Sequence, residues 1–409
     1  MTRRSRRVRG LPFVPLALWA SSLGACGAAS ARATSASAPP SEPAPEAPRE
    51  AARYDVPEGE ASFDLVVRSG EVHVYGAFAG ESARTLARFD LDTAGLPTRA
   101  APLELSRDPL APSETAVAAV AIGAHDLVAL CDRSDDGSTR YAALWVDATG
   151  AVTERVELGA YPAEDVVDAP CFLAVARSRD AAIVFHGRDS LACPRVTYDD
   201  PADQCPGYGA DALVRGQPPE ELVRVGVAGT PALVGTELGW AWGVGPYAIR
   251  ASFVVDRADM PDASFVIDAD SVTGFVATRD TLVVLGEGES RALVGITMRG
   301  AEVLTGPPAR DELPTVEAQL SLGCTEGAVS ATVRTGTITT LVRAGEPSSA
   351  VSWRHLISPD QPGPTSSPGA SYAALDGRVY HAAFNGELDI VECVAGALSH
   401  RSSSWRRED

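Results

Sequence analysis

Apolar and polar residues alternate with a period of two through most of residues 53–398, in short runs that end at Gly, Asp or Pro. Clear examples, rich in β-branched and aromatic residues, are 63–67, 72–75, 126–130, 182–185 and 281–285. This period places alternate side chains on the two faces of a strand, whereas an amphipathic helix has a period of 3.6 residues. The region contains no convincing helical pattern, so the sequence predicts an all-β domain.

Two turns between predicted strands share one pattern. A strand ends at Asp92 and Gly95 follows three residues later, and the same spacing separates Asp147 from Gly150. Asp at the first and Gly at the fourth position suit a type I turn, because the carboxylate caps the turn amides and Gly accepts the strained exit. The two copies lie about 55 residues apart, which indicates an internal repeat.

Strand-rich units of three or four short strands recur along the domain, at 61–105, 113–159, 166–228, 230–268, 271–308, 314–358 and 369–396. This arrangement is similar to a β-propeller, in the broad group that contains WD40, kelch and quinoprotein-type blades, although the signatures of those families are missing. The resemblance implies six or seven blades. Because the units differ in length, tandem β-sandwiches remain the alternative architecture.

The first 25 residues have the organisation of a signal peptide. Residues 1–9 carry five arginines and no acid, and the apolar run 11–23 is shorter than the roughly 20 residues that a membrane-spanning helix needs. The segment ends in Leu23-Gly24-Ala25-Cys26, which resembles the lipobox of bacterial lipoproteins. That resemblance implies that Cys26 is acylated on sulfur and becomes the first mature residue. Cleavage after Ala33 is the alternative, and it would discard Cys26.

Residue 27 is Gly rather than the Asp that marks inner-membrane retention in the enterobacterial lipoproteins it resembles. The lipobox therefore implies an outer-membrane lipoprotein that faces the periplasm or the cell surface. Residues 26–52 are mostly Ala, Pro, Ser and Glu and predict a disordered linker between the lipid and the domain at 53–398. The polar residues 399–409 predict a flexible tail.

The chain has 409 residues and a formal net charge of -19, which argues against nucleic acid as a partner and limits membrane contact to the lipid anchor. All 35 basic residues are Arg, so chemistry that needs a lysine amine is excluded. Apart from Cys26, six cysteines remain, an even number that suggests three disulfides in an exported protein. Cys193 and Cys205 bracket a turn-rich loop and are expected to pair. Cys131 with Cys171, and Cys324 with Cys393, then follow by elimination.

The sequence contains no recognisable catalytic or metal-binding motif. The six histidines are scattered, and His73, His186 and His381 sit inside strand patterns where a structural, hydrogen-bonded role is more common. No pair of cysteines or histidines has zinc-ligand spacing. A triad assembled from distant segments stays open, since such groups need to be adjacent only in space.

Calcium is the one cofactor that the acidic segments suggest, and only as a minor alternative. Residues 132–137 imitate half of a calcium loop, but Ala143 stands where a bidentate Glu is needed, and a solvated turn explains the same residues. Two further acidic groups are Asp199, Asp200 and Asp203, and Asp256, Asp259 and Asp262. Trp240 and Trp242 would project to one face of a strand, either as a stacking platform or as core residues.

These features predict a lipid-anchored binding or scaffolding protein at the cell envelope, without catalysis, whose partner is an envelope protein, a peptide or a glycan. The alternative is a propeller-type hydrolase or lyase that acts on envelope polysaccharide or peptide, with two carboxylates and a histidine in one pocket. A purely structural envelope lipoprotein is a third hypothesis.

Overall fold

The computed structural model describes 20 segments of the chain, and every structural statement below refers to them. They are 53–54, 61–79, 84–105, 114–162, 171–178, 180–191, 205–226, 231–236, 239–244, 248–252, 263–265, 271–277, 281–287, 292–297, 316–335, 338–346, 350–351, 353–357, 370–383 and 386–407. The signal peptide, Cys26 and the linker predicted at 26–52 lie outside these segments.

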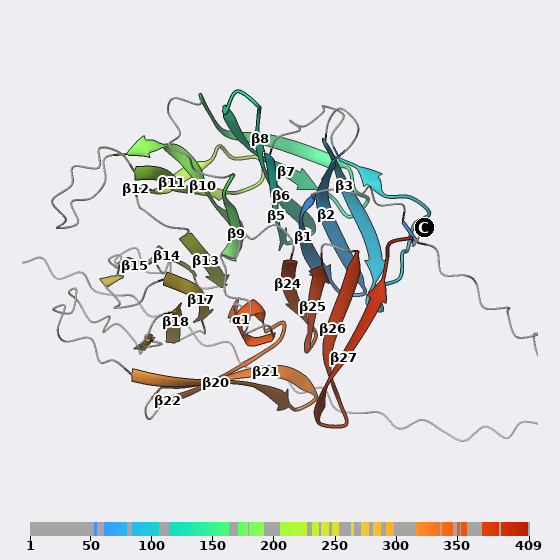
Figure 1. Ribbon diagram of the computed structural model, residues 1–409, viewed down its shortest axis with the longest axis vertical. Helices are drawn as coiled ribbons and strands as arrows, with labels where there is room; N and C mark the ends of the chain where they lie inside the picture. Colours follow the sequence, from blue (N-terminus) through green and yellow to red (C-terminus); the bar gives the residue numbers. More distant parts are fainter. Residues whose placement is uncertain are drawn as a thin grey trace, which may run out of the picture. The chain divides into compact units, whose positions relative to one another are not determined.

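The described strands form six antiparallel sheets, in which strands that follow one another along the chain are paired, with one exception in the fifth sheet (Figure 1). The first sheet contains β1 (Ala61–Arg68), β2 (Glu71–Ala79), β3 (Arg84–Asp92) and β4 (Leu103–Glu104). The second contains β5 (Glu114–Ile122), β6 (His125–Arg133), β7 (Thr139–Val146) and β8 (Val152–Tyr161). The third contains β9 (Leu173–Ser178), β10 (Ala181–Leu191), β11 (Cys205–Leu213) and β12 (Glu220–Gly226).

The fourth, fifth and sixth sheets follow in the same way. The fourth contains β13 (Pro231–Thr236), β14 (Gly239–Val244), β15 (Ala248–Ser252) and β16 (Ala263–Phe265). The fifth has seven strands, which are β17 (Ser271–Ala277), β18 (Thr281–Glu287), β19 (Ala292–Thr297), β20 (Val316–Thr325), β21 (Ala328–Thr335), β22 (Ile338–Arg343) and β23 (Ala350–Val351). The sixth contains β24 (Ala370–Leu375), β25 (Arg378–Ala383), β26 (Glu387–Val394) and β27 (Ala397–Ser404).

Sheets six, one, two, three, four and five meet in that order through strands near the centre, and the fifth sheet meets the sixth through β21 and β26. β24 contacts β1, β1 contacts β5, β5 contacts β9, β9 contacts β13, and β13 contacts β17. The sheets therefore stand around a common centre like blades (Figure 1). This confirms the predicted all-β propeller, and the tandem β-sandwich alternative is wrong because each sheet packs against two neighbours in a ring rather than against one partner.

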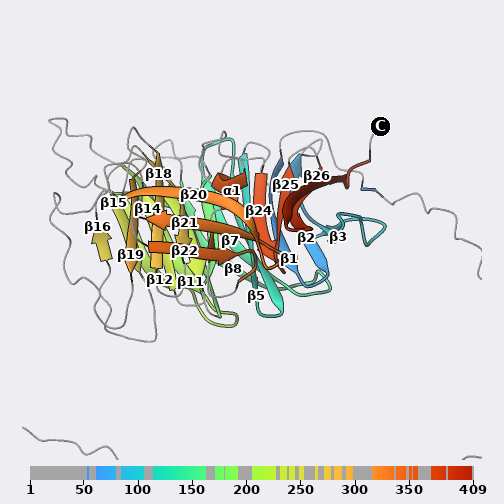
Figure 2. The same ribbon diagram turned by 90° about the horizontal axis from the view of Figure 1, so that it is seen from below.

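The predicted units agree with these sheets except at two places, one of which is the end of the chain, where the unit 369–396 stops before β27. Units 271–308 and 314–358 were expected to be separate, but β19 pairs with β20 through Ala292 with Glu317 and Leu293 with Val316, which joins them into the seven-stranded sheet. β23 pairs with the inner edge of β17, and the short helix α1 (Trp353–Ile357) follows it. α1 contacts β20 and β24 and so lies between the fifth and sixth sheets (Figures 1 and 2).

Alternate residues of one strand pack on opposite sides of its sheet. On β2, Val74 belongs to a core cluster that includes Ile390 and Trp405 of the last sheet and its end, whereas Tyr75 belongs to a cluster shared with Val128 of the second sheet. The period of two read from the sequence therefore produces hydrophobic cores on both sides of the sheet.

Residues 399–407 do not form the flexible tail that their polar composition predicts. β27 extends to Ser404, and Trp405, which is 1% exposed, packs against Phe89 with ring centroids 5.0 Å apart. The main chain of Tyr54 donates to the Trp405 carbonyl and accepts from the Arg407 amide, both at 2.9 Å. The prediction was wrong because an outer strand can be polar when one aromatic residue anchors its end.

Within the described segments, no helix is long and apolar enough to cross a membrane.

Candidate functional site

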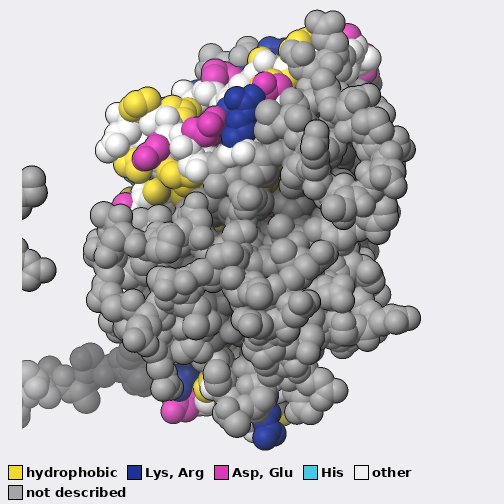
Figure 3. Space-filling view, turned by 90° about the vertical axis from the view of Figure 1, so that its left-hand side faces the viewer, with side chains coloured by type: hydrophobic (Ala, Val, Ile, Leu, Met, Phe, Trp, Pro, Cys, Tyr) yellow, Lys and Arg dark blue, Asp and Glu magenta, His cyan; other side chains and the backbone are white. Residues whose placement is uncertain are grey.

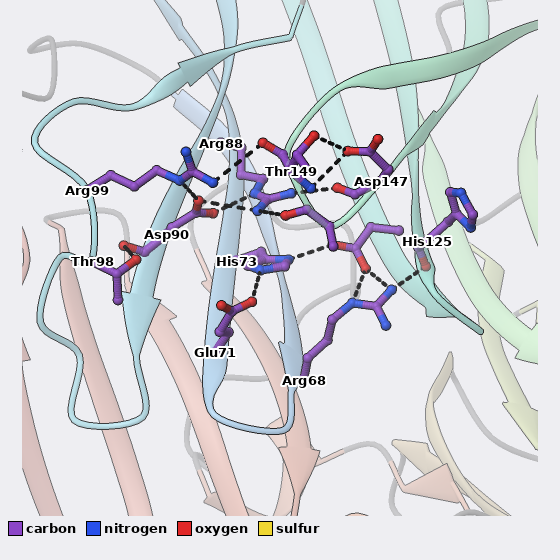
Figure 4. Close-up of polar contacts among 12 residues, drawn as sticks. Arg68, Glu71, His73, Arg88, Asp90, Thr98, Arg99, His125, Asp147 and Thr149 are labelled. Atoms are coloured by element: carbon purple, nitrogen blue, oxygen red, sulfur yellow. Dashed lines mark hydrogen bonds and ion pairs between the residues drawn. The ribbon is translucent and has the colours of Figure 1, made fainter.

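Among the described residues, one extended group of charged and polar residues lies between the first and second sheets, near the turns β1–β2, β5–β6 and β7–β8 (Figure 4). We call it the inter-sheet polar cluster. Its members are Arg68, Glu71, His73, Tyr75, Arg88, Asp90, Thr98, Arg99, His125, Asp126, Asp147 and Thr149.

Asp126, on β6, is the hub of this cluster and is 1% exposed. Its Oδ2 accepts hydrogen bonds from His73 Nδ1 at 2.7 Å and from the Tyr75 hydroxyl at 2.5 Å. Its Oδ1 accepts from Arg68 Nε and Nη2 at 2.8 and 2.5 Å. Arg68 also donates to the main-chain carbonyls of Gly123 and His125. One carboxylate of the second sheet therefore gathers three side chains of the first.

The ionisation of Asp126 follows from these contacts. Burial alone would raise the pKa of its carboxyl, but the hydrogen bonds from His73 and Tyr75 and the charge of Arg68 outweigh burial and lower the pKa below the ordinary value. Burial and the neighbouring carboxylate raise the pKa of the Tyr75 hydroxyl well above its ordinary value. At neutral pH Asp126 is therefore a charged acceptor and Tyr75 a neutral donor.

The second half of the cluster is built on Arg88, which is 1% exposed. Arg88 Nε donates to Asp90 Oδ1 at 2.5 Å on the same strand, and Nη1 and Nη2 donate to the carbonyls of Asp147 and Ala148, each at 3.0 Å. Arg99 donates to Asp90 from the other side. The guanidinium fork thus attaches the β7–β8 turn to the first sheet.

That turn and its counterpart at Asp92 have the geometry expected from the sequence. The Gly95 amide donates to the Asp92 carbonyl at 2.9 Å, and the Gly150 amide to the Asp147 carbonyl at 3.0 Å. Both glycines have φ near +85°, at 84° and 89°. The Asp147 carboxylate accepts from the Thr149 hydroxyl and from two turn amides, and these bonds lower its pKa. The predicted turn pattern is confirmed at both positions.

A second buried group surrounds His186 on β10, which is 0% exposed. His186 Nε2 lies 2.8 Å from Asp211 Oδ2, and its Nδ1 donates to the Gly187 carbonyl at 2.8 Å. Arg188 Nη2 contacts both oxygens of Asp211, at 2.8 and 2.7 Å. The side chain of His186 is fully enclosed, so it holds the third sheet together rather than facing solvent.

His381 forms a more open group on the last sheet. Its ring stacks on Tyr372 with centroids 4.3 Å apart, and Nδ1 lies 3.1 Å from Asp389 Oδ2. The three residues are cross-strand neighbours on β24, β25 and β26. All three histidines predicted to be structural are thus hydrogen-bonded within strands, as expected.

Two carboxylates and a histidine do converge, at Glu71, His73 and Asp126, which is the arrangement that the hydrolase alternative requires. His73 Nε2 lies 3.1 Å from Glu71 Oε2, whose side chain is 55% exposed. However, His73 and Asp126 are each 1% exposed, and both ring nitrogens of His73 are occupied by carboxylates. A general acid or base must reach a substrate proton, and these two groups are enclosed. Their arrangement serves to join the sheets.

The cysteine predictions are confirmed where both partners are described. Cys131 is bonded to Cys171 and Cys324 to Cys393, with Cα atoms 5.7 and 5.8 Å apart. Cys205 lies in β11, but Cys193 lies outside the described segments, so that pairing stays a prediction.

The half calcium loop is a hairpin turn between β6 and β7. The Asp136 carboxylate accepts from the Ser134 hydroxyl at 2.5 Å and the Ser138 amide at 2.9 Å, and these bonds lower its pKa to about 2. Among the residues described here, no group of three or more His, Cys, Asp or Glu is placed to hold a metal ion. The acidic groups at 199–203 and 256–262 lie outside the described segments, and Trp240 and Trp242 are both in β14.

Several exposed charges on the described surface form ion pairs despite the acidic composition. Figure 3 shows Arg side chains next to Asp or Glu on one face. Arg224 Nη2, for example, lies 2.5 Å from Asp189 Oδ2, and both side chains are about 40% exposed, at 41% and 42%.

No known protein family matches the sequence, and no curated protein matches it. Solved structures of similar fold include the six-bladed β-propeller lectin of Aleuria aurantia, at 9% identity and a TM-score of 0.40 over 85% of this chain and 96% of that one. Saccharomyces cerevisiae Sqt1 has 9% identity and a TM-score of 0.40 over 84% and 85% of the two chains. A GH43_1 enzyme from Xanthomonas citri has 11% identity and a TM-score of 0.30 over 72% and 90%. With scores below 0.5, these similarities carry no function to this chain, whose propeller architecture rests on its own strand pairing.

Proposed function

We propose that the chain is an exported, lipid-anchored β-propeller that works as a binding or scaffolding protein at the cell envelope. The observation that carries this proposal is the position of the disulfides. Cys131–Cys171 links the second sheet to the segment that enters the third, and Cys324–Cys393 links β20 to β26. Disulfides form and persist outside the reducing cytosol, so covalent links between sheets favour a protein that folds after export.

The lipobox-like segment supplies the anchor in this proposal. Export places Cys26 where it can be acylated, and residues 27–52 then act as the spacer between the membrane and the propeller. The acidic net charge keeps the body from adsorbing to anionic lipid, which suits a tethered protein that contacts other envelope components. The partners expected are an envelope protein, a peptide or a glycan, and the location proposed is the outer membrane.

Binding is favoured over hydrolysis because the clusters that could do acid–base chemistry are used to hold the frame. Asp126 and His73 are enclosed, and Asp211 is engaged by both His186 and Arg188. Groups that are paired in this way make the framework of sheets rigid, but they are not accessible to a substrate. The hydrolase alternative therefore depends on Glu71, the exposed carboxylate of the inter-sheet polar cluster.

Export and lipidation are tested by expressing the full chain in a Gram-negative host beside the matched variant Cys26→Ser. Mass spectrometry of the purified wild type should find an N-terminal peptide that begins at Cys26 and carries fatty acyl chains, and membrane fractionation should place it in the outer membrane. The variant should be unacylated. An unmodified wild-type N-terminus, or wild-type protein in the cytosolic fraction, would contradict the anchor.

Binding and hydrolysis are separated by offering the purified protein peptidoglycan fragments and envelope polysaccharide. We expect retention of one of these, or of a cross-linked envelope protein, without release of new reducing ends. New reducing ends that disappear in Glu71→Gln, while that variant keeps the wild-type melting temperature, would establish the hydrolase alternative instead. A protein that retains no envelope component would refute the binding proposal.

A further inference from the structure

Asp64 joins three innermost strands at the place where the ring closes. It lies on β1, between β24 of the last sheet and β5 of the second. Its Oδ2 accepts a hydrogen bond from the Ala119 amide of β5 at 2.7 Å, and its Oδ1 accepts from the Leu65 amide at 2.8 Å. The hydroxyl of Ser371, on β24, contacts the same Oδ1 and also accepts from the Leu65 amide at 3.1 Å.

These contacts satisfy backbone amides of strands such as β1 and β5, each of which is the last strand of its sheet on the central side. One edge of such a strand faces the centre of the ring and has no neighbouring strand to accept its amides, which are costly to leave unpaired when buried. Ser371 caps the Leu65 amide from one neighbouring strand, and Asp64 caps the Ala119 amide of the next. Ser62 repeats the device two residues earlier by accepting from the Val117 amide at 2.9 Å.

Asp64 differs from the two serines because it carries an ionisable group, and its described contacts supply no cation. The titratable or charged residues on the elements packed against it are Arg68 on β1, Glu71, His73 and Tyr75 on β2, Glu114 on β5, Tyr372 on β24, and Arg378, Tyr380 and His381 on β25. Tyr75 is its cross-strand partner, but the Tyr75 hydroxyl donates to Asp126, as do the side chains of Arg68 and His73.

We propose that Asp64 is an acid-responsive clasp, which strengthens the closure between the first and last sheets when it takes up a proton. In the protonated form the carboxyl is neutral, and it still accepts from the Ser371 hydroxyl and from the Leu65 and Ala119 amides. In the ionised form the same contacts enclose a negative charge without a counterion among the described partners. This inference does not depend on export or lipidation.

The electrostatics support this geometry. Although part of the residue remains accessible, enclosure by three strands raises the pKa of Asp64 to about 6, against the lowering effect of the hydrogen bonds from Ser371, Ala119 and Leu65. A carboxyl whose pKa is raised in the folded state favours folding below its unfolded value of 3.8, and that contribution is lost as the pH rises through about 6. This change of stability with pH is opposite in direction to the change that an ordinary salt-bridged carboxylate causes.

The test is the unfolding constant of the full chain in urea, measured between pH 5 and pH 7 for wild type and Asp64→Asn. Asp64 alone should make the wild-type constant about tenfold larger at pH 7 than at pH 5, and this part of the pH dependence should disappear in the variant. The two proteins are compared by how steeply their unfolding constants change with pH. The constants themselves are not compared, because the side-chain amide of Asn also places an N–H donor opposite the main-chain amides that Asp64 caps. Equal slopes in the two proteins would overturn the proposal.

Two further variants keep the test decisive if Asp64→Asn does not fold. Ser371→Ala removes a donor that lowers the pKa of Asp64, so the midpoint of the pH profile should move upward, and an unmoved midpoint would overturn the proposal. His73→Gln is the matched control, because His73 is an ionisable residue of the neighbouring strand β2 that contacts Asp126 rather than Asp64, and the variant should keep the Asp64 slope. Hydrogen exchange at the Leu65 and Ala119 amides, corrected for intrinsic rates, should slow on acidification in wild type only.

Discussion

His73 Nδ1 lies 2.7 Å from Asp126 Oδ2, although the two residues belong to different sheets and are 53 positions apart in the chain. Both are buried, and the same carboxylate also accepts from Tyr75 and Arg68. The seam between these sheets is therefore polar at one end and hydrophobic along Tyr75, Val128 and their neighbours. A buried polar network that is fully paired fixes how two surfaces fit together, which hydrophobic contact alone does less well.

Removing the hub should be costly. We expect Asp126→Ala to lower the free energy of unfolding by about 3–5 kcal/mol, because Arg68, His73 and Tyr75 then lose their acceptor inside the protein. Urea unfolding followed by circular dichroism measures this change. Asp135→Ala, an exposed residue of the β6–β7 turn, is the matched control and should leave the free energy unchanged within error. Similar losses for both variants would mean that the network does not stabilise the seam.

Asp126 should also determine part of the stability in acid. Its pKa is lowered in the folded state, so its contribution is present above the unfolded value of 3.8 and is lost as the pH falls through the folded value. We expect the melting temperature of wild type to fall steeply below about pH 4, and Asp126→Asn to show a shallower fall from a lower starting point. Parallel acid limbs in the two proteins would assign the effect to other carboxylates.

The sequence predicted the repeat because its signals are local. Alternating strands and the Asp–Gly turns at 92–95 and 147–150 each depend on residues within a few positions, and the structure contains both. The three histidines in strands could also be interpreted from their immediate neighbours. The elimination that paired Cys131 with Cys171 and Cys324 with Cys393 gave pairs that the structure contains, because both link sheets that follow one another in the ring.

The polar clusters could not be predicted, since their members meet only after the sheets pack. In the sequence, Asp126 and Asp64 are each a single carboxylate next to apolar residues, and nothing in their neighbours distinguishes them from the other aspartates of the chain. A buried charge inside an alternating strand is the one signal that could have singled them out, because isolated charges are rarely enclosed without partners. The pairing of β19 with β20 could not be predicted either, because it consists of two residue pairs between strands that are separated by a gap in the alternating pattern.

The β26–β27 turn offers a stabilising substitution. Ala395 has φ of 52°, and Gly396 follows with φ of 82°, which is the left-handed pair that a two-residue hairpin of type I′ requires. Ala is disfavoured in this region and Asn tolerates it, so Ala395→Asn should raise the free energy of unfolding by about 0.5–1 kcal/mol. Ala397→Asn, two residues on and inside β27, is the control and should give no gain. A loss at position 395 would mean that the turn differs from this geometry.

The two disulfides should differ in how easily they are reduced. Cys131 and Cys171 are 0% and 7% exposed, whereas Cys324 and Cys393 are both half-buried. A thiolate must reach a sulfur atom to exchange with it, so increasing concentrations of dithiothreitol under native conditions should open Cys324–Cys393 first. Alkylation followed by peptide mass spectrometry identifies which pair has opened. Because the buried bond closes a loop of 40 residues, Cys131→Ala with Cys171→Ala should lower the free energy of unfolding by about 4 kcal/mol. Reduction of the buried pair first would mean that the seam between the second and third sheets opens readily, contrary to the close packing of its core.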